Sequence, residues 1–305
     1  MELLDYLKER YPFRKVEFVN HNLIETEQGL KRIRYWENKE LLDWHIEWRD
    51  RCSVTPCILI DRMIRTKDKQ AFARWENGWL TVHDELNDSF KQNGKEAVWG
   101  QLLGTMIKHG LTAETKVTAK EKQSPKFNKL PLHTVKLDEG QRQLLQRCIE
   151  ESNYRVKKSE QLLTRSRDEV PPLLDPIYSL HQAQQMYNIL VWKGGDGRPE
   201  RSYRSLCALL SDWCAQHGEA SLQELLDEIE RVGELSREQC LLLVSECLLP
   251  YELDRVVDAC ESTSVSATEL KQTVDYSLME WERSRHLVQA LSRWVDKNMK
   301  VVTQK

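Results

Sequence analysis

Strand patterns occur almost only in the first 85 of the 305 residues, and this uneven distribution is the strongest constraint on the fold. Residues 15–20 alternate between polar and apolar side chains, as in a half-buried strand. Turn signals at Gln28-Gly29 and Asn77-Gly78 separate further strand patterns, which predicts two hairpins. Residues 36–51 lie between the hairpins and carry apolar residues at helical spacing. The N-terminal region is therefore predicted to form a small antiparallel sheet with one helix.

Helical patterns dominate the rest of the chain. The predicted helices cover residues 97–109, 138–165, 199–217, 221–232, 236–248, 250–259 and 267–298. Ser236, with Gln239 three residues later, forms a capping-box pattern at the start of one of them. Residues 112–130 are rich in Lys, Thr and Ser, and they are predicted to be a mobile insert. We expect an α+β fold with a sheet lobe at residues 1–90 and a helical lobe at residues 91–305.

The charge and hydrophobicity of the chain exclude several classes of partner. A formal net charge of −3 gives no overall field that would recruit nucleic acid or an anionic membrane. The lysine-rich segment around Phe127 fits a solvated insert better than a nucleic-acid patch. No apolar run approaches the roughly 18 residues needed to span a bilayer. The N-terminus lacks the basic start and apolar core of a signal peptide, so a cytoplasmic protein without a membrane span is predicted.

Eight cysteines are scattered along the chain without a Cys-x-x-Cys pair. They stand at positions 52, 57, 148, 207, 214, 240, 247 and 260. This spacing gives no zinc motif, and a reducing compartment disfavours disulfides. Buried free thiols are therefore predicted.

His181, Ala183 and Asn188 stand at the spacing of a phosphotransferase catalytic loop, followed by three aliphatic residues. In such a loop, an Asp two residues after the His accepts the proton of the substrate hydroxyl. An Asn five residues further on holds a magnesium ion. Ala183 occupies the Asp position here, and a methyl group cannot accept a proton. An alternative interpretation is a helix end followed by a short strand, with the His and Asn at this spacing by coincidence.

Further segments occur in the order that one family shows. They are Gly29-Leu30-Lys31-Arg32-Ile33-Arg34, residues 42–49, residues 60–68, residues 198–206 and residues 248–253. Together with His181 and Asn188, they resemble the bacterial spore-coat CotS/YutH family of the protein-kinase-like (aminoglycoside phosphotransferase-like) superfamily. The resemblance extends over nearly the whole chain. It implies a two-lobe kinase-like fold, with a small sheet lobe before a mainly helical lobe.

The resemblance assigns roles to residues of the N-terminal lobe. By position, Lys31 is similar to the strand lysine that contacts nucleotide phosphates. Glu47 on the following helix would be its ion-pair partner, with Glu40 as the alternative. Without the surrounding pattern, Lys31 is an exposed strand lysine, and Glu47 belongs to a solvated helix face.

The departures from the family pattern concern catalysis. No Gly-x-Gly-x-x-Gly precedes Lys31 to cradle phosphates. The second metal-binding Asp of the family lies on an apolar strand, whereas Asp196 stands between two glycines in a turn. Ala183 replaces the base as well. We therefore predict a catalytically inactive kinase-fold protein, a pseudokinase without catalytic residues, metal or cofactor, ATP and magnesium included.

The resemblance implies a structural or assembly component of the spore coat. Such a protein is made in the mother-cell cytoplasm and has other coat proteins as partners. Two alternatives stay open. An active small-molecule phosphotransferase using ATP would need a carboxylate from elsewhere, such as Asp175, Asp196 or Asp212, beside Asn188. A helical adaptor with an unrelated fold would lack the N-terminal sheet.

Overall fold

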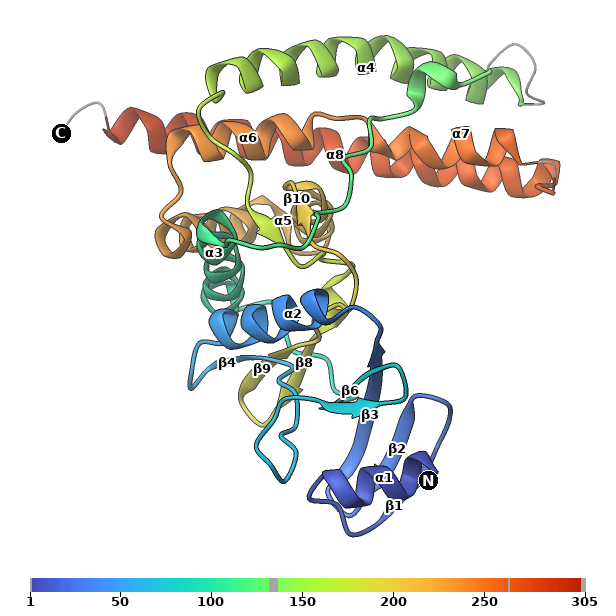
Figure 1. The fold of residues 1–305 in the computed structure, drawn as a ribbon. Coiled ribbons are helices and arrows are strands. Elements are labelled where there is room, and N and C mark those ends of the chain that lie inside the picture. The colour runs from blue at the N-terminus through green and yellow to red at the C-terminus, as the bar shows by residue number, and fades with distance from the viewer. Residues whose placement is uncertain (1, 132–136, 263, 303–305) are drawn as a thin grey trace. The chain divides into compact units, whose positions relative to one another are not determined.

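The computed structural model describes residues 2–131, 137–262 and 264–302, and the chain divides into two compact units (Figure 1). The first unit combines the N-terminal segment up to Lys120 with Leu173–Glu200. The second combines Glu121–Pro172 with Arg201–Lys305. Both units are therefore built from two separate segments of the chain. The lobe boundary after residue 90 and the mobile insert remain predictions.

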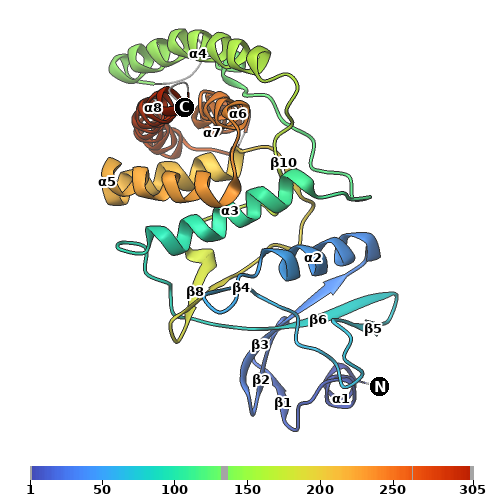
Figure 2. The same cartoon turned by 90° about the vertical axis from the view of Figure 1, so that its left-hand side faces the viewer.

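A five-stranded antiparallel sheet forms the N-terminal part of the first unit, in the order β1-β2-β3-β6-β5 (Figure 2). Its strands are β1 (Val16–Phe18), β2 (Leu23–Thr26), β3 (Gly29–Trp36), β5 (Ala73–Trp75) and β6 (Gly78–Asp84). Gly29 adopts a φ of +90° at the β2–β3 turn, a conformation that favours glycine. Gly78 begins β6, where a Cβ would collide with the carbonyl of Trp36. Both predicted hairpins are confirmed.

Two helices pack against this sheet, α1 (Leu3–Arg10) and α2 (Lys39–Cys52). Because side chains alternate along a strand, Ile33 and Trp36 of β3 point to opposite faces of the sheet. Ile33 belongs to the apolar cluster that contains Leu7 of α1, and Trp36 belongs to the cluster that contains Leu42 of α2. The two other even-numbered residues nearest Trp36 on β3 are arginines, so the face toward α2 also carries two cations.

A three-stranded sheet in the order β4-β9-β8 completes the framework of the first unit. Its strands are β4 (Ile58–Ile60), β8 (Ala183–Met186) and β9 (Ile189–Trp192). β9 pairs antiparallel with β8 and parallel with β4, so that Ile60 faces Trp192. The carboxyl ends of β4 and β9 therefore meet at one edge, where Asp61 and Gly194 follow. Helix α3 (Glu96–Thr112) packs against β7 (Leu173–Leu174), and β10 (Glu200–Arg201) follows the last segment of this unit.

The second unit is built from helices. They are η1 (Phe127–Lys129), α4 (Glu139–Arg165), α5 (Arg204–Gly233), α6 (Arg237–Cys247), η3 (Tyr251–Leu253), α7 (Asp254–Glu261) and α8 (Ala267–Val302). Helices α4, α6 and α8 pack side by side (Figure 2). The predicted cap is confirmed, because Ser236 Oγ accepts a hydrogen bond from Gln239 N at 3.1 Å. The helices predicted at 199–217 and 221–232 are joined in α5 with a kink at Gly218, whose φ is +81°.

Residues 113–131, which follow α3, contain little regular structure, yet side chains fix part of this segment. Phe127 is buried in an apolar cluster with Leu145 and Trp281. Lys126 N donates to Asp254 Oδ1 at 2.7 Å. The aromatic residue at the centre of the lysine-rich stretch is therefore part of the core of the second unit.

The cysteines depart from the prediction of buried free thiols at Cys57, which is exposed, and at Cys207 and Cys247. Cys207 of α5 and Cys247 at the end of α6 form a disulfide. The prediction of free thiols is wrong for this pair, because two helices distant in sequence bring the sulfur atoms together. Cys52, Cys148 and Cys240 are buried free thiols, as predicted.

The length and hydrophobicity of the helices bear on membrane insertion. Among the described residues, no helix combines the length and the apolar composition that a bilayer span requires. The predicted absence of a spanning helix is confirmed for this part of the chain.

Candidate active site

Asp61 is the centre of a buried ion cluster at the edge where β4 and β9 end. Its carboxylate accepts hydrogen bonds from Arg32 Nη2 at 2.8 Å and from Arg49 Nε at 3.1 Å. Arg34 Nη2 lies 3.6 Å from Oδ2, and Gly194 N donates to Oδ1 at 3.0 Å. Burial alone would raise the pKa of Asp61, but the surrounding positive charges hold this pKa below its usual value. One buried carboxylate therefore organises three guanidinium groups.

A second carboxylate reduces the excess positive charge of the cluster. Glu85 accepts hydrogen bonds from Arg32 Nη1 at 2.7 Å and from Lys193 Nζ at 2.7 Å. Burial lowers the pKa of Arg34 to about 10, so its guanidinium stays charged at neutral pH. The cluster is therefore an assembly of charged groups, and each cation needs its acidic partner.

Two buried histidines act in the cluster as neutral hydrogen-bonding groups. His83 Nδ1 donates to the backbone carbonyl of Asp61 at 2.9 Å, and burial lowers the pKa of His83 to about 3. Burial likewise holds the pKa of His45 well below its usual value. His45 Nδ1 accepts from Arg49 Nη1 at 2.9 Å, which leaves Nε2 to donate to the carbonyl of Gly197 at 2.8 Å. Both rings orient backbone groups and carry no charge at neutral pH.

The loop of residues 194–197, here called the glycine loop, is held by the cluster through its backbone. Arg34 Nη2 donates a hydrogen bond to the carbonyl of Gly194 at 2.6 Å, and Arg34 Nη1 donates to the carbonyl of Gly195. Arg49 Nη2 donates to the carbonyl of Gly195 at 2.8 Å. The side chain of Asp196, in the middle of the loop, is exposed. The fold thus fixes the backbone on both sides of one exposed carboxylate.

Gly195 has no room for a side chain, because a Cβ there would lie 2.5 Å from Oδ1 of the buried Asp175. Gly195→Ala is therefore expected to lower the free energy of unfolding by about 2 kcal/mol, as overpacking typically does. Gly197→Ala is the matched control, since its Cβ would lie 3.8 Å from the nearest atom, Lys120 Nζ. Gly197→Ala should lower the free energy of unfolding by about 0.5 kcal/mol or less. Urea denaturation measures both, and equal losses would contradict this account of the crowding.

Asp175, which follows β7, is 1% exposed and faces the glycine loop. Its Oδ2 accepts a hydrogen bond from Gly195 N at 2.6 Å. Oδ1 is buried and has no hydrogen-bond partner among the described residues. Burial raises the pKa of Asp175 to about 6, although Arg49 and the bond from Gly195 act in the opposite direction. A buried carboxyl with a raised pKa is typical of functional sites.

The raised pKa of Asp175 predicts a pH-dependent stability. A group whose pKa is raised on folding contributes stability that is fully present below its unfolded pKa of 3.8 and lost as the pH rises through about 6. Relative to Asp175→Asn, the wild type should lose up to about 3 kcal/mol of unfolding free energy between about pH 4 and pH 7, since one pKa unit equals about 1.4 kcal/mol. Urea denaturation of both proteins measures this difference. A difference that does not change with pH would contradict the prediction.

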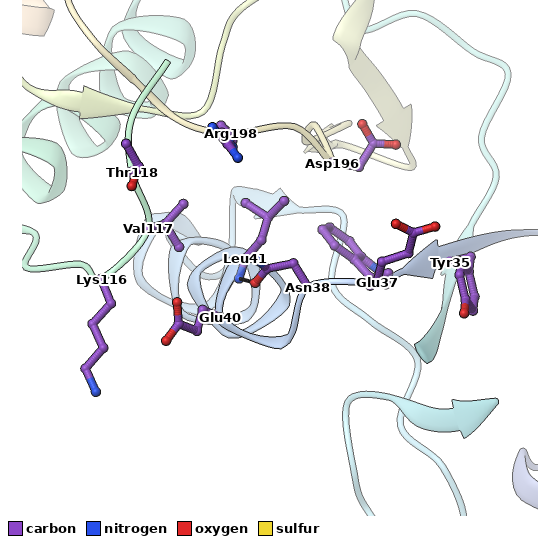
Figure 3. A pocket seen from close by; sticks show the side chains of 11 residues that line it. Tyr35, Glu37, Asn38, Glu40, Leu41, Lys116, Val117, Thr118, Asp196 and Arg198 are labelled. Carbon is purple, nitrogen blue, oxygen red and sulfur yellow. Dashed lines mark hydrogen bonds between the residues drawn. The ribbon is translucent and has the colours of Figure 1, made fainter. Parts of the chain in front are cut away.

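A pocket of about 440 Å³ in the first unit is lined by the glycine loop, the start of α2 and residues after α3. Its lining residues are Tyr35, Trp36, Glu37, Asn38, Glu40, Leu41, Lys116, Val117, Thr118, Asp196 and Arg198. Figure 3 shows Asp196 and Glu37 near each other at one end of the pocket, and Glu40 and Lys116 at the other end. Lys116 and Arg198 bring two cations to its wall. The pocket therefore combines carboxylates with groups that can pair with phosphate.

The residues of the expected catalytic loop belong to a hairpin. Asn188 lies with Tyr187 at the exposed turn between β8 and β9. Ala183 is buried in β8 opposite Trp192, and His181 is exposed in η2 (Leu180–Gln182). None of the three predicted positions lines the 440 Å³ pocket. The segment is thus a 3-10 turn followed by a two-stranded hairpin, and a catalytic-loop role of these three positions stays a prediction.

The expected pair of Lys31 and Glu47 is not formed. Lys31 Nζ lies 2.9 Å from the carboxylate of Asp84. Glu47 is exposed on α2, with Arg51 Nε 3.9 Å away. Glu40, the alternative partner, lines the pocket instead. A nucleotide contact of Lys31 remains a prediction.

The three carboxylates considered for an active enzyme have separate places in the fold. Asp196 lines the pocket, and Asp175 anchors the loop that carries it. Asp212 lies on α5 in the second unit, 3.9 Å from Arg283. Asp61, the centre of the cluster, is not among the predicted site residues. Its only local signal is an Asp directly after a short apolar run.

Comparison with known proteins identifies the fold. No protein-family model and no curated protein matches the sequence. An aminoglycoside phosphotransferase from Alicyclobacillus acidocaldarius is 11% identical, with a TM-score of 0.68 over 97% of each chain. A spectinomycin phosphotransferase, solved with ADP and spectinomycin, is 12% identical, with a TM-score of 0.60 over 96% of this chain and 97% of that chain. An amicoumacin kinase, solved with AMP-PNP and Ca²⁺, is 12% identical, with a TM-score of 0.53 over 93% of this chain and 94% of that chain. The chain has the α+β protein-kinase-like fold that the resemblance implied.

These similarities contradict the prediction that the chain is not an enzyme. The solved proteins that share its fold over nearly their whole length are named phosphotransferases and a kinase. The prediction rested on Ala183 in place of the proton acceptor, on the missing glycine-rich loop before Lys31, and on Asp196 as a turn residue instead of a metal ligand. In the structure, Ala183 lies in a strand, whereas the glycine loop after β9 presents its own carboxylate, Asp196.

Proposed function

We propose that the protein is a phosphotransferase that moves a phosphoryl group from ATP to a small molecule bearing a hydroxyl or an amine. The proposed site is the 440 Å³ pocket that Asp196 lines. The observation that carries the proposal is the glycine loop, whose backbone is fixed by Arg34, Arg49 and His45 while its one carboxylate is exposed. A fixed loop supports catalysis, because a reacting group must be held in place before the reaction.

The lining residues suit the steps of such a transfer. Asp196 is the proposed proton acceptor: it takes the proton of the acceptor group as the new bond to phosphorus forms and the bond to the nucleotide leaving group breaks. Lys116 and Arg198 are the proposed partners of the phosphate oxygens, because ammonium and guanidinium groups pair well with phosphate. These roles need only side chains that line one pocket.

The donor groups of the pocket also fit magnesium, on which phosphoryl transfer of this kind depends. When bound with the nucleotide, such an ion would neutralise the charge of the phosphates. It binds through one or two carboxylates and keeps several waters. Glu37 and Glu40 offer such oxygens in the pocket. Among the described residues there is no group of three or more His, Cys, Asp or Glu side chains that could hold a metal alone, so we propose that the nucleotide supplies the remaining ligands.

The sequence resemblance supports a second proposal, which concerns the cellular location and the partners of the protein. We infer that the protein is made in the mother cell and acts in or on the spore coat, with other coat proteins as partners. The support is the resemblance of residues 29–34 and 198–206 to the CotS/YutH family. Immunolabelling of sporulating cells tests this, and a signal spread evenly through vegetative cells would contradict it.

Nucleotide binding gives the first test of the proposed activity. Magnesium and ATP at about 100 times the dissociation constant should raise the midpoint of thermal unfolding by roughly 5 °C. Lys116→Met should reduce this shift, because it removes a phosphate partner from the pocket. Lys91→Met changes an exposed lysine outside the pocket and should leave the shift unchanged. No shift at millimolar nucleotide would contradict the proposal.

A further inference from the structure

Asp175 touches the glycine loop at the point where a side chain would not fit. Its Oδ2 accepts the amide hydrogen of Gly195 at 2.6 Å, and Gly195 directly precedes Asp196. The carbonyl of Gly195 is at the same time held by Arg49 Nη2 at 2.8 Å and by Arg34. The peptide group on each side of Gly195 is therefore fixed by a charged, buried side chain.

We propose that Asp175 is a positioning residue for Asp196, which acts through the backbone of Gly195 and loosens the glycine loop when it takes up a proton. The inference rests on the proposed function for its catalytic consequence, but not for its effect on the loop. The geometry that carries it is the 2.6 Å bond, together with an Oδ1 that is buried and has no partner among the described residues. A protonated carboxyl is a weaker acceptor for Gly195 N than a carboxylate. While Asp175 stays buried, protonation therefore weakens this one bond, although it also relieves the burial of charge and so stabilises the folded protein against complete unfolding.

Charged groups of opposite sign surround Asp175, and they act in opposite directions on the ionisation of its carboxyl. Arg49 of α2 and Arg34 of β3 favour the ionised form, and Asp61 after β4 opposes it. Cys52 at the end of α2 is buried and interacts with the same carboxyl. The raised pKa of Asp175, about 6, lies within the range where the protein can be measured in its folded state. Protonation would leave both arginines with less opposing charge, in addition to weakening the bond to Gly195.

Amide hydrogen exchange of the peptide spanning residues 193–198 tests the proposal on the full chain, with the peptide of α3 as the internal reference. In the wild type, protection of residues 193–198 should be about tenfold lower at pH 5 than at pH 7.5, after correction for intrinsic rates, because a hydrogen bond to a charged group is worth about that factor. Asp175→Asn should show the same protection at both pH values. Asp175→Ala should remove the protection at both.

The outcomes separate this inference from the proposed function. Wild-type protection that does not change between pH 5 and pH 7.5 relative to α3 overturns it, even if Asp175→Ala fails to fold. If the pH effect on the loop is present and the wild type transfers no phosphate, the positioning role stands and the proposed function fails. If transfer occurs, its rate should fall toward pH 5 in the wild type. Asp175→Asn has no carboxyl at this position, so its rate should not show that fall. A parallel fall in both proteins would contradict the role of Asp175.

Discussion

Asp61→Asn is expected to lower the free energy of unfolding by about 3–5 kcal/mol, since it removes one partner of a buried ion network. The side chain of Asp61 is 4% exposed and serves Arg32, Arg34 and Arg49 together. Without its charge, three guanidinium groups would stay in a dry environment with little to balance them. Urea or thermal unfolding measures the loss, and a variant too unstable to purify would agree with it.

The same network predicts an acid limit of stability. The pKa of Asp61 is lowered in the folded protein, so its contribution is present above the unfolded pKa of 3.8 and is lost as the pH falls through the folded pKa. Asp43→Asn is the matched control, because Asp43 is exposed and its ion-pair partner among the described residues is Lys39 of the same helix, α2. The control should change the free energy of unfolding by about 0.5 kcal/mol or less. Similar losses for both variants would show that the buried cluster does not organise the unit.

Asp196→Asn is expected to reduce the rate of phosphoryl transfer by about 100-fold to 10,000-fold, the range for loss of a proton acceptor. The amide is almost the same size but cannot take a proton from the acceptor group. Because Asp196 is exposed, the substitution should leave the midpoint of thermal unfolding nearly unchanged. The loss should therefore be a loss of rate in a folded protein.

Asp88→Asn provides the control for this variant, because Asp88 is an exposed acid of the same unit and does not line the pocket. It should keep the wild-type rate. A comparison of kcat with KM adds a second check, since a proton acceptor acts on kcat more than on substrate binding. If Asp196→Asn kept the wild-type kcat, the proton acceptor would be another residue.

Local signals in the sequence were sufficient for much of the fold. The turn glycine at 29, the Asn77-Gly78 pair and the cap at Ser236 act on their immediate neighbours, and all three stand in the structure as predicted. The two helices predicted on either side of Gly218 are joined by a kink, and the first begins at Arg204 instead of residue 199. Such features depend on residues a few positions apart, so a single sequence can show them.

The candidate site depends on contacts that a single sequence does not show. The parallel pairing of β4 with β9 brings Asp61 next to Gly194, and no local sequence pattern predicts that the two strands pair. The alternation of Arg32 and Arg34 along β3 was visible in the sequence, but the face they share was not. Lys31, which directly precedes Arg32, was the predicted site residue of this strand, although it points to the other face and pairs with Asp84.

The inactive reading failed for a related reason. It took Ala183 as the place of the lost proton acceptor and Asp196 as a turn residue instead of a metal ligand, because the spacing of residues along the chain was compared with a known pattern. Spacing along the chain gives no information on which residues share a cavity. The structure groups the carboxylates of Glu37, Glu40 and Asp196 around one pocket instead.

Transfer of label from γ-labelled ATP, with magnesium, to a panel of small hydroxyl and amine compounds tests the central claim most directly. The account predicts labelled product with at least one acceptor in the wild type, little product with Asp196→Asn, and full product with Asp88→Asn. Wild-type protein that binds the nucleotide but labels no acceptor and releases no phosphate above the buffer rate would contradict it.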